Sequence, residues 1–380
     1  MNIMNRIDKF RKLKKKYGDN NLFSIFLFLY FFKKWNIGIQ DYFENKVYCD
    51  CPEREARLES IFEYTHSWTI QKKIYQAEHS KIWFLYHYFE FQTMRLFYRG
   101  LDAADYFRYQ FYAVRHCRRK TFITEGRLAE LNQEFNKNGD ISLENDKGKF
   151  NTLFSPFIYR KWFLSYNISR PDFLAMCDGL DRVIVKPLEG SQGKGIFVAD
   201  VSASEDREKL FQQIKDDKYI VEELVHQHAS VSAVNPACTN TIRVYSVVKD
   251  NAVYVTGAVF RIGNGLQPTD NYCAGGYAAE IDLQTGIVIS TAINKEGDRV
   301  LIHPVTGHVI LGFRLPCWDM VIDTVKKAHR LVPDLRYMAW DVVVTDDERV
   351  TFLEGNTWGG VELQQHPSQT GKLPIYESLL

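Results

Sequence analysis

The first third of the sequence has very little glycine or proline. Residues 1–120 hold 3 of the 23 glycines and 1 of the 11 prolines, together with 29 of the 54 aromatic residues. Because glycine and proline mark turns and loops, their scarcity predicts a mainly helical, aromatic-rich region over residues 1–120. Their abundance afterwards predicts strands and loops.

The sequence also lacks paired cysteines. Of its seven cysteines, only Cys49 and Cys51 lie close together, so there is neither a zinc-site spacing nor a disulfide framework. A reducing, cytoplasmic location is therefore expected. The 45% hydrophobic and 25% charged composition excludes disordered and collagen-like chains.

No hydrophobic run is long enough to span a membrane. The apolar run over 22–32 falls short of the roughly 20 residues that a bilayer requires, and it ends in Lys33-Lys34-Trp35 without a cleavage site. Seven basic residues lie within positions 6–16 ahead of it. The segment is either a peripheral contact with an anionic membrane surface or, slightly favoured, an aromatic core helix with a basic cap.

Charge is distributed unevenly along the chain. Residues 1–120 carry 22 basic and 13 acidic side chains, a net of +9, whereas the other 260 residues have a net of −8. No nucleic-acid partner is expected. We predict four regions: a basic helical region (1–120), a linker (121–180), a small lobe (181–225) and a large lobe (226–380).

The pattern after residue 180 favours a strand-dense α+β architecture. Helices are expected over 68–98, 103–118, 204–214 with Ser204 as the cap, and 318–331. Strands are expected over 182–186, 195–199, 219–221, 242–248, 252–260, 278–281 and 286–290.

A glycine-rich loop between two short β-branched runs is the first candidate site. It comprises Lys186, Pro187, Leu188, Glu189, Gly190, Ser191, Gln192, Gly193, Lys194 and Gly195. Glycines let the backbone N–H groups approach phosphate oxygens closely, and the two lysines supply compensating charge. The loop is not a P-loop, because Gly195 stands where Ser or Thr is required and a strand follows instead of a helix.

A second candidate site is a hairpin over residues 340–356. A two-residue turn at Asp347 and Glu348 would place Asp341 directly opposite Glu354, with Asn356 on the same face. Two carboxylates so close destabilise a hairpin unless a cation lies between them. The alternatives are a raised carboxylate pKa or a register slip. Because these oxygen ligands suit Mg²⁺ held jointly with phosphates, a metal site is the preferred interpretation.

Several shorter signals lie between these two sites. They are Glu222-Glu223-Leu224, Asn240-Thr241-Ile242-Arg243, Arg261, and Asn271 followed by Gly275-Gly276. Each is weak alone, but their order along the chain is informative.

In that order these motifs resemble the ATP-grasp superfamily. Val234-Asn235-Pro236 before the Arg243 motif, His303-Pro304 before Thr306-Gly307, and Leu353-Glu354-Gly355-Asn356 are similar to the sugar-transfer-associated ATP-grasp group of bacterial surface-polysaccharide gene clusters. The resemblance covers about residues 100 to 368.

The resemblance implies an ATP-grasp fold, in which two α+β lobes clamp ATP. Lys147 and Lys186 would contact the nucleotide, Glu222, Glu223 and Leu224 would bind adenine, and the 190–195 loop would close over the phosphates. Arg243 and Asn271 would face the transferred phosphoryl group. Asp341, Glu354 and Asn356 would hold one or two Mg²⁺ ions.

The sequence departs from several superfamily ligases at one position. Those ligases have an arginine two residues before the metal-binding Asp, whereas this chain has Ala339. Arg243 or Arg261 is the candidate to replace it.

The resemblance implies a carboxylate–amine ligase that forms an amide through an acyl phosphate. Its substrates would be a sugar acid or amino acid and an amine such as an aminosugar, used in capsule or lipopolysaccharide synthesis. A phosphotransferase on the same fold and a nucleotide-binding regulatory module are the alternatives, and the metal-binding residues argue against the module.

Overall fold

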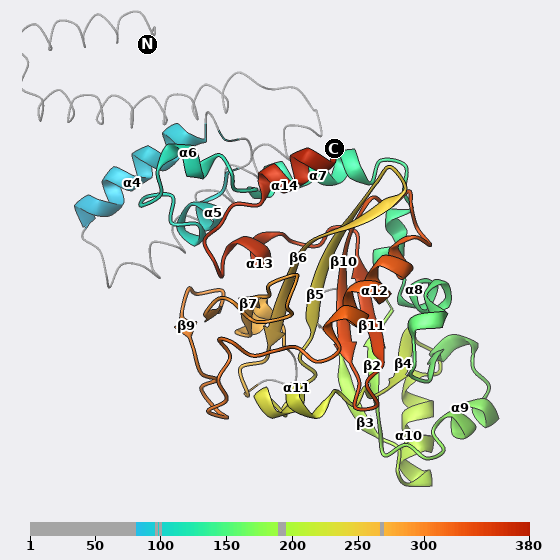
Figure 1. The fold of residues 1–380 in the computed structure, drawn as a ribbon. Helices are drawn as coiled ribbons and strands as arrows, with labels where there is room; N and C mark the ends of the chain where they lie inside the picture. The colour runs from blue at the N-terminus through green and yellow to red at the C-terminus, as the bar shows by residue number, and fades with distance from the viewer. Residues whose placement is uncertain (1–80, 96–97, 99–100, 189–194, 267–269) are drawn as a thin grey trace, which may run out of the picture. The chain divides into compact units, whose positions relative to one another are not determined.

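The computed structural model describes residues 81–95, 98, 101–188, 195–266 and 270–380 (Figure 1). The chain forms two compact units, residues 1–97 and 98–380. In the first unit the described part is helix α4 (Lys81–Met94). The predictions for residues 1–80, including the basic segment and the part of the predicted helix over 68–98 that precedes Lys81, lie outside the described residues.

A seven-stranded antiparallel sheet organises the large lobe of the second unit. Its strand order is β11-β10-β5-β6-β7-β8-β9. The bounds are β5 (Ile242–Lys249), β6 (Ala252–Ile262), β7 (Tyr277–Glu280), β8 (Ala292–Ile293), β9 (Arg299–Val300), β10 (Tyr337–Val344) and β11 (Val350–Asn356).

Helices cover both faces of this sheet, because alternate residues of its central strands are apolar on each side. On the first face, helix α12 (Trp318–His329) packs over β5, β6 and β10, around Trp340 and Phe352 (Figure 1). On the second face, three helices form another core: α7 (Glu125–Phe135), α13 (Glu362–Gln365) and α14 (Leu373–Leu379).

A four-stranded antiparallel sheet forms the small lobe. Its order is β1-β4-β2-β3, with β1 (Trp162–Leu164), β2 (Arg182–Pro187), β3 (Phe197–Asp200) and β4 (Tyr219–Glu223). Helices α9 (Arg170–Met176) and α10 (Ser204–Ile214) bury Phe173, Leu210 and Phe211 against it. The predicted α+β fold with two lobes is therefore confirmed.

Shorter elements connect these parts. They are α5 (Ala103–Arg108), α6 (His116–Arg119), η1 (Ile141–Glu144), α8 (Lys147–Leu153), η2 (Ser155–Phe157), η3 (Ser165–Asn167), α11 (Ala229–Val234) and η4 (Tyr272–Ala274). Among the residues that the structure describes, no helix has the length and apolar character needed to cross a bilayer.

Three predicted elements differ from the structure. The helix predicted over 103–118 ends at Arg108, because Gln110 takes a left-handed φ of 49°. Ser204 is the first residue of its helix, and the cap position belongs to Ala203. Residues 286–290 make isolated bridges instead of a named strand, at Ile287 and Val288. The predicted region limits at 120, 180 and 225 stay predictions.

Candidate active site

The candidate site lies at one end of the second face of the large sheet. That face is apolar where it meets α7 and α14, at Tyr245, Val259 and Ala339. Two residues further along the same three strands stand Arg243, Arg261 and Asp341. Because side chains alternate along a strand, these three charged groups point to the same side as the apolar residues.

Asp341 is the centre of this charged cluster. Its residue surface is only 3% exposed. Arg243 donates from Nε to Oδ1 at 2.7 Å and from Nη2 to Oδ2 at 2.6 Å, and Arg261 Nη1 donates to Oδ2 at 2.8 Å. Burial alone would raise the pKa of Asp341, but the two guanidinium groups hold it well below its usual range. Asp341 is therefore ionised and fixes both arginines.

Glu354 lies directly opposite Asp341 on β11, which confirms the predicted pairing. Its side chain is 47% exposed, its Oε1 is 3.8 Å from Arg243 Nη2, and Asn356 Nδ2 donates to that oxygen at 3.5 Å. The pKa of Glu354 is raised, first by lost hydration and then by the charge of Asp341, while Arg243 opposes the shift. Asp341 and Glu354, which we call the acidic pair, therefore still favour additional positive charge beside them.

The predicted two-residue turn at Asp347 and Glu348 is wrong. The N–H of Thr345 donates to the carbonyl of Arg349 at 2.8 Å, which leaves three residues in the loop, and Glu348 takes a left-handed φ of 62°. A register shift then leaves Leu353 without a partner in the pairing of β10 with β11. The longer loop shifts the strand pairing by one residue, and the irregularity at Leu353 shifts it back. Asp341 and Glu354 therefore still lie opposite each other.

Arg261 is held by a second carboxylate. Its Nη2 lies 3.3 Å from Oδ1 of Asp270, which is buried. Thr241 donates to Oδ2 of Asp270 from its N–H, at 2.9 Å, and from its hydroxyl. Within the described part of the chain, the buried Nε of Arg261 has no hydrogen-bond partner. Arg261 therefore keeps one donor that a bound anionic group can use.

The chain itself occupies the space beside Ala339. A Cβ added at Gly359 would lie 2.2 Å from the Ala339 Cβ, so the backbone of the segment after Asn356 passes directly over it. A larger side chain has no room there. The cationic groups at the acidic pair therefore come from β5 and β6, as predicted for Arg243 and Arg261.

In the small lobe, the carboxylate of Glu222 accepts hydrogen bonds from three side chains. Lys186 Nζ donates to its Oε2 at 2.5 Å, while Arg160 Nε at 2.9 Å and Asn151 Nδ2 at 2.8 Å donate to Oε1. Burial would raise the pKa of Glu222, but Lys186 and Arg160 lower it to about 2. Arg160 Nη1 also donates to the carbonyl of Phe352 in the large lobe, at 2.6 Å. Glu222 therefore links the two lobes.

Lys147 stands at the start of α8, near the charges of both lobes. Its Nζ donates to the Leu188 carbonyl at 3.4 Å. Burial lowers the pKa of Lys147, against the attraction of Glu354, and Lys186 adds to the lowering. The charges of Glu354, Lys186 and Glu222 therefore all act on Lys147, and the contact of Lys147 and Lys186 with a nucleotide stays a prediction.

Most of the glycine-rich loop lies outside the described residues, namely Glu189, Gly190, Ser191, Gln192, Gly193 and Lys194. Its ends are described. The flanking strands β2 and β3 pair in antiparallel fashion, and Gly195 takes a left-handed φ of 75°. The loop therefore connects a hairpin of the small lobe, and its phosphate-binding role stays a prediction.

Two further predicted residues, Glu223 and Asn271, have structural contacts. The Glu223 carboxylate accepts from the N–H of Lys161 at 3.0 Å, beside Leu224. The Asn271 side chain accepts from the N–H of Cys273 at 3.0 Å and caps η4. Their roles towards adenine and phosphate stay predictions.

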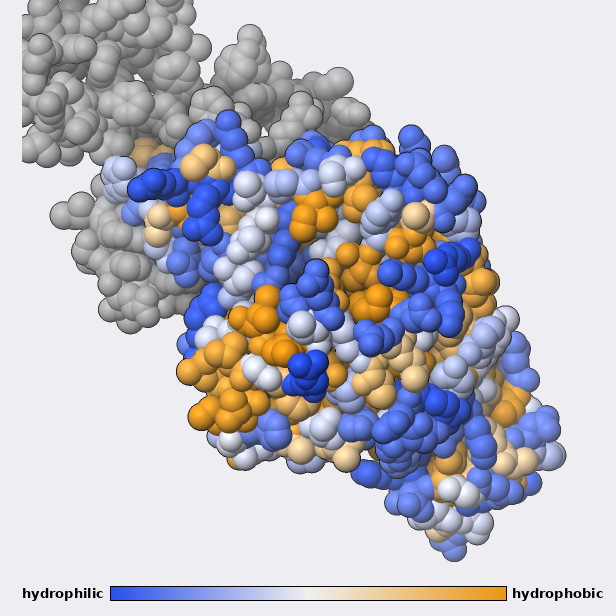
Figure 2. Space-filling view, viewed as in Figure 1, coloured by the Kyte–Doolittle hydropathy of each residue, from blue (hydrophilic) through white to orange (hydrophobic). Residues whose placement is uncertain are grey.

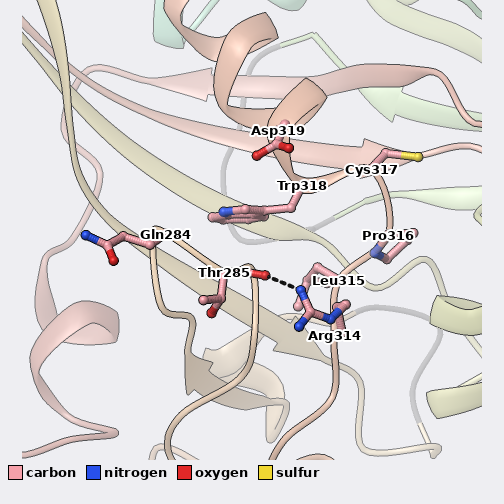
Figure 3. A pocket seen from close by; sticks show the side chains of 8 residues that line it. All are labelled: Gln284, Thr285, Arg314, Leu315, Pro316, Cys317, Trp318 and Asp319. Atoms are coloured by element: carbon pink, nitrogen blue, oxygen red, sulfur yellow. Dashed lines mark hydrogen bonds between the residues drawn. The ribbon is translucent and has the colours of Figure 1, made fainter.

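Two cavities lie outside this charged cluster. One, of about 160 Å³, adjoins the hinge between the lobes and is lined in part by Leu224, His226 and Arg349. The other, of about 480 Å³, lies at the start of α12 and is shown in Figure 3, with Arg314 bonded to the Thr285 carbonyl beside the Trp318 ring. Neither contains a predicted catalytic or metal-binding residue.

The acidic pair fits a magnesium ion. Among the described residues, no group of three or more His, Cys, Asp or Glu side chains could hold a metal by itself. A metal here would therefore rest on Asp341, Glu354 and the Asn356 amide, completed by phosphate or water oxygens, which is how proteins usually bind Mg²⁺.

Sequence reasoning missed Arg160, Asn151 and Asp270. Arg160 and Asn151 stand 62 and 71 positions from Glu222 in the sequence, and no local motif marks either of them. Asp270 directly precedes the Asn271 motif, which was the available signal for it.

Solved structures that are similar to this one share little sequence with the chain. A complex of ATP-grasp ligase PsnB with minimal precursor, Mg and ADP is 15% identical, with a TM-score of 0.37 over 62% of this chain and 58% of that one. The ADP complex of purK, an N5-carboxyaminoimidazole ribonucleotide synthetase, is 12% identical, with a TM-score of 0.36 over 61% and 53%.

A D-alanine-D-alanine ligase from Coxiella burnetii is 11% identical, with a TM-score of 0.34 over 63% of this chain and 53% of that one. The chain thus spans less than two thirds of the length of each of these structures. No curated protein matches the sequence.

The family comparison is more extensive. The model described as sugar-transfer associated ATP-grasp matches residues 129–378, which is more than half of the chain. The predicted resemblance over residues 100 to 368 is confirmed, although the matched segment begins and ends later in the sequence than predicted. This chain belongs to the sugar-transfer associated ATP-grasp family.

Proposed function

We propose that the protein is an ATP-dependent carboxylate–amine ligase that forms an amide through an acyl phosphate. The observation that carries this proposal is the acidic pair Asp341 and Glu354, bracketed by Arg243 and Arg261. Such a cluster can neutralise the charge that moves when a phosphoryl group passes to a carboxylate.

The lysines would bind the nucleotide. Lys147 and Lys186 would contact ATP, with the glycine-rich loop over its phosphates and the segment Glu222 to Leu224 at its adenine. Lys186 would then share its charge between the phosphates and Glu222, which keeps its contacts with Arg160 and Asn151.

In the first step, a substrate carboxylate oxygen would attack the γ-phosphorus, and the bond to the leaving ADP oxygen would break. Arg243 and the free Nε of Arg261 would hold the oxygens of the transferred group. Mg²⁺, held by Asp341, Glu354 and Asn356, would supply further charge neutralisation.

In the second step, an amine would attack the acyl carbon of the acyl phosphate. Phosphate would leave, the nitrogen would lose a proton, and the amide would remain. Arg243 and Arg261 would stabilise the oxyanion that forms at this carbon, in place of the arginine that Ala339 excludes. Asn271 would contact the transferred phosphate.

The substrates we propose are a sugar acid or amino acid and an amine such as an aminosugar. The family description, sugar-transfer associated, supports a role in capsule or lipopolysaccharide synthesis. We further propose that the enzyme is cytoplasmic, acts on these small molecules and has no nucleic-acid partner.

The experiment that tests the proposal is incubation of the protein with ATP, Mg²⁺ and pooled carboxylates and amines. Mass spectrometry should detect ADP, phosphate and a new amide in equal amounts, and Glu354→Gln should slow the formation of all three by roughly a hundredfold. A phosphoester with ADP and no free phosphate would instead identify a phosphotransferase. ATP binding without any turnover would identify a regulatory module.

A further inference from the structure

An arm of the large lobe exposes an unusual number of aliphatic side chains. We define the apolar arm as residues 300–311, which follow β9. Its exposed members and two neighbours are Leu301 (51% exposed), Ile302 (51%), Val305 (58%), Val309 (57%), Leu311 (40%), Leu266 (79%) and Ile289 (54%). Figure 2 shows hydrophobic residues gathered at the lower left, where Figure 1 draws β9 and the segment that follows it. Single exposed aliphatic residues are ordinary, but a contiguous group of them indicates a binding surface.

The arm also lacks charge. Residues 300–313 contain no Lys, Arg, Asp or Glu, although a quarter of the whole chain is charged. A hairpin that remains in water normally carries such residues, which keep it from associating with other surfaces. The absence of charged side chains over this stretch indicates that the arm also contacts an apolar environment.

The exposed aliphatic side chains lie along the arm and in its turn. Ile302 pairs with Val309, so these two side chains share one face. Leu301, at a bend directly before Ile302, is equally exposed. Val305 lies in the turn at the tip. A Cβ added at Gly265 would lie 2.7 Å from Val305 Cγ2, so the neighbouring loop, with Leu266, continues the surface.

The arm is firmly attached to the lobe. His303 is fully buried, and its Nε2 is 2.8 Å from the Gly263 carbonyl oxygen. The Thr306 hydroxyl donates to the Val234 carbonyl at 2.7 Å. The loop that starts at Gly263 leads to Asp270, which holds Arg261 in the candidate active site.

We propose that the apolar arm, with Leu266, inserts into the interfacial layer of a lipid bilayer. An uncharged arm that exposes aliphatic side chains at consecutive positions and in its turn fits the interfacial layer of a bilayer, where apolar side chains are buried about 5–10 Å deep. Protein interfaces, in contrast, normally have a polar rim. The sequence supports this occupant independently, because the basic residues within positions 6–16 suit an anionic membrane surface. The protein is then a peripheral membrane enzyme whose substrate lies at the membrane surface.

Flotation of the full-length protein with phosphatidylcholine vesicles tests the proposal. These vesicles carry no net charge, so binding through the arm should be insensitive to salt, whereas binding through the basic segment requires anionic lipid and weakens as salt rises. The double variant Val305→Asp and Val309→Asp should reduce the bound fraction by about tenfold. ATP turnover with a soluble substrate should be unchanged, because neither residue contacts the candidate site.

Met320→Asp is the matched control, since Met320 is 47% exposed on α12 and lies outside the arm. It should bind vesicles as the wild type does. If the Asp double variant fails to fold, the milder Val305→Ser and Val309→Ser variant decides the matter. The proposal is overturned if the wild type does not float, if the arm variants float equally well, or if light scattering shows a dimer that the arm variants dissociate.

Discussion

Neutralising either carboxylate of the acidic pair should affect the stability of the fold to very different extents. Asp341→Asn removes the charge that two buried guanidinium groups share, through three hydrogen bonds of 2.6 to 2.8 Å. Removing one partner of a buried ion pair costs about 3–5 kcal/mol of folding free energy. Glu354→Gln removes a half-exposed charge that lies 3.8 Å from the nearest guanidinium nitrogen and opposite a like charge. Its effect on the free energy of unfolding should stay within about 0.5 kcal/mol.

Thermal unfolding measures this difference. For a domain of this size, each kcal/mol shifts the melting temperature by about 2–4 °C. Asp341→Asn should therefore lower it by about 6–20 °C, and Glu354→Gln should change it by about 2 °C or less. Both variants should lose turnover by roughly a hundredfold, about 2.7 kcal/mol of transition-state stabilisation.

Magnesium provides the control that connects stability with the site. Mg²⁺ at ten times its dissociation constant should stabilise the wild type by about 1.4 kcal/mol, and it should not stabilise Glu354→Gln. Equal melting temperatures for the two variants would refute the assignment of Asp341 as the buried anchor of both arginines. Normal turnover by Glu354→Gln would refute the metal assignment.

Three further outcomes are expected. Lys186→Ala should weaken ATP binding by roughly tenfold in calorimetry, because the positive charge of the lysine beside the phosphates is lost. An unchanged affinity would show that other residues contact the phosphates. Ala339→Arg should destabilise the fold by at least about 1–3 kcal/mol in urea, because the Gly359 backbone leaves no space, whereas Ala339→Ser should melt within a few degrees of wild type. The pKa of Glu222 falls from 4.5 to about 2 on folding, so its contribution to stability is present above pH 4.5 and is lost as the pH falls towards 2. Glu222→Gln should flatten this slope, and a slope that persists in the variant would assign it to other carboxylates.

The central strands of the large sheet could be predicted from the sequence because their patterns are strong. Runs such as Val342 to Val344 are apolar on both faces, as strands covered by helices on both sides require. The opposition of Asp341 and Glu354 was also predicted correctly. It depends, however, on a three-residue loop and a register irregularity that offset one another, and neither has a sequence signal such as Asn-Gly.

Other features depend on tertiary contacts that local patterns do not contain. The break after Arg108 follows from the left-handed conformation of Gln110, although the surrounding residues favour a helix. The ion pair of Arg160 with Glu222 joins segments that meet only when the small sheet forms. Similarly, the covering of Ala339 by Gly359 could not be expected from two small residues twenty positions apart.

The contact of Arg160 with both Glu222 and the Phe352 carbonyl has a mechanical consequence. It joins the small sheet to β11 at one point, beside the segment that connects the lobes. A rotation of the small lobe about this pivot would displace each atom in proportion to its distance from it. Lys186, bonded to the same carboxylate, would hardly move, whereas β3, at the edge of the small sheet, would travel further. Closure of the lobes would thus leave one end of a bound nucleotide in place and change the surroundings of the other.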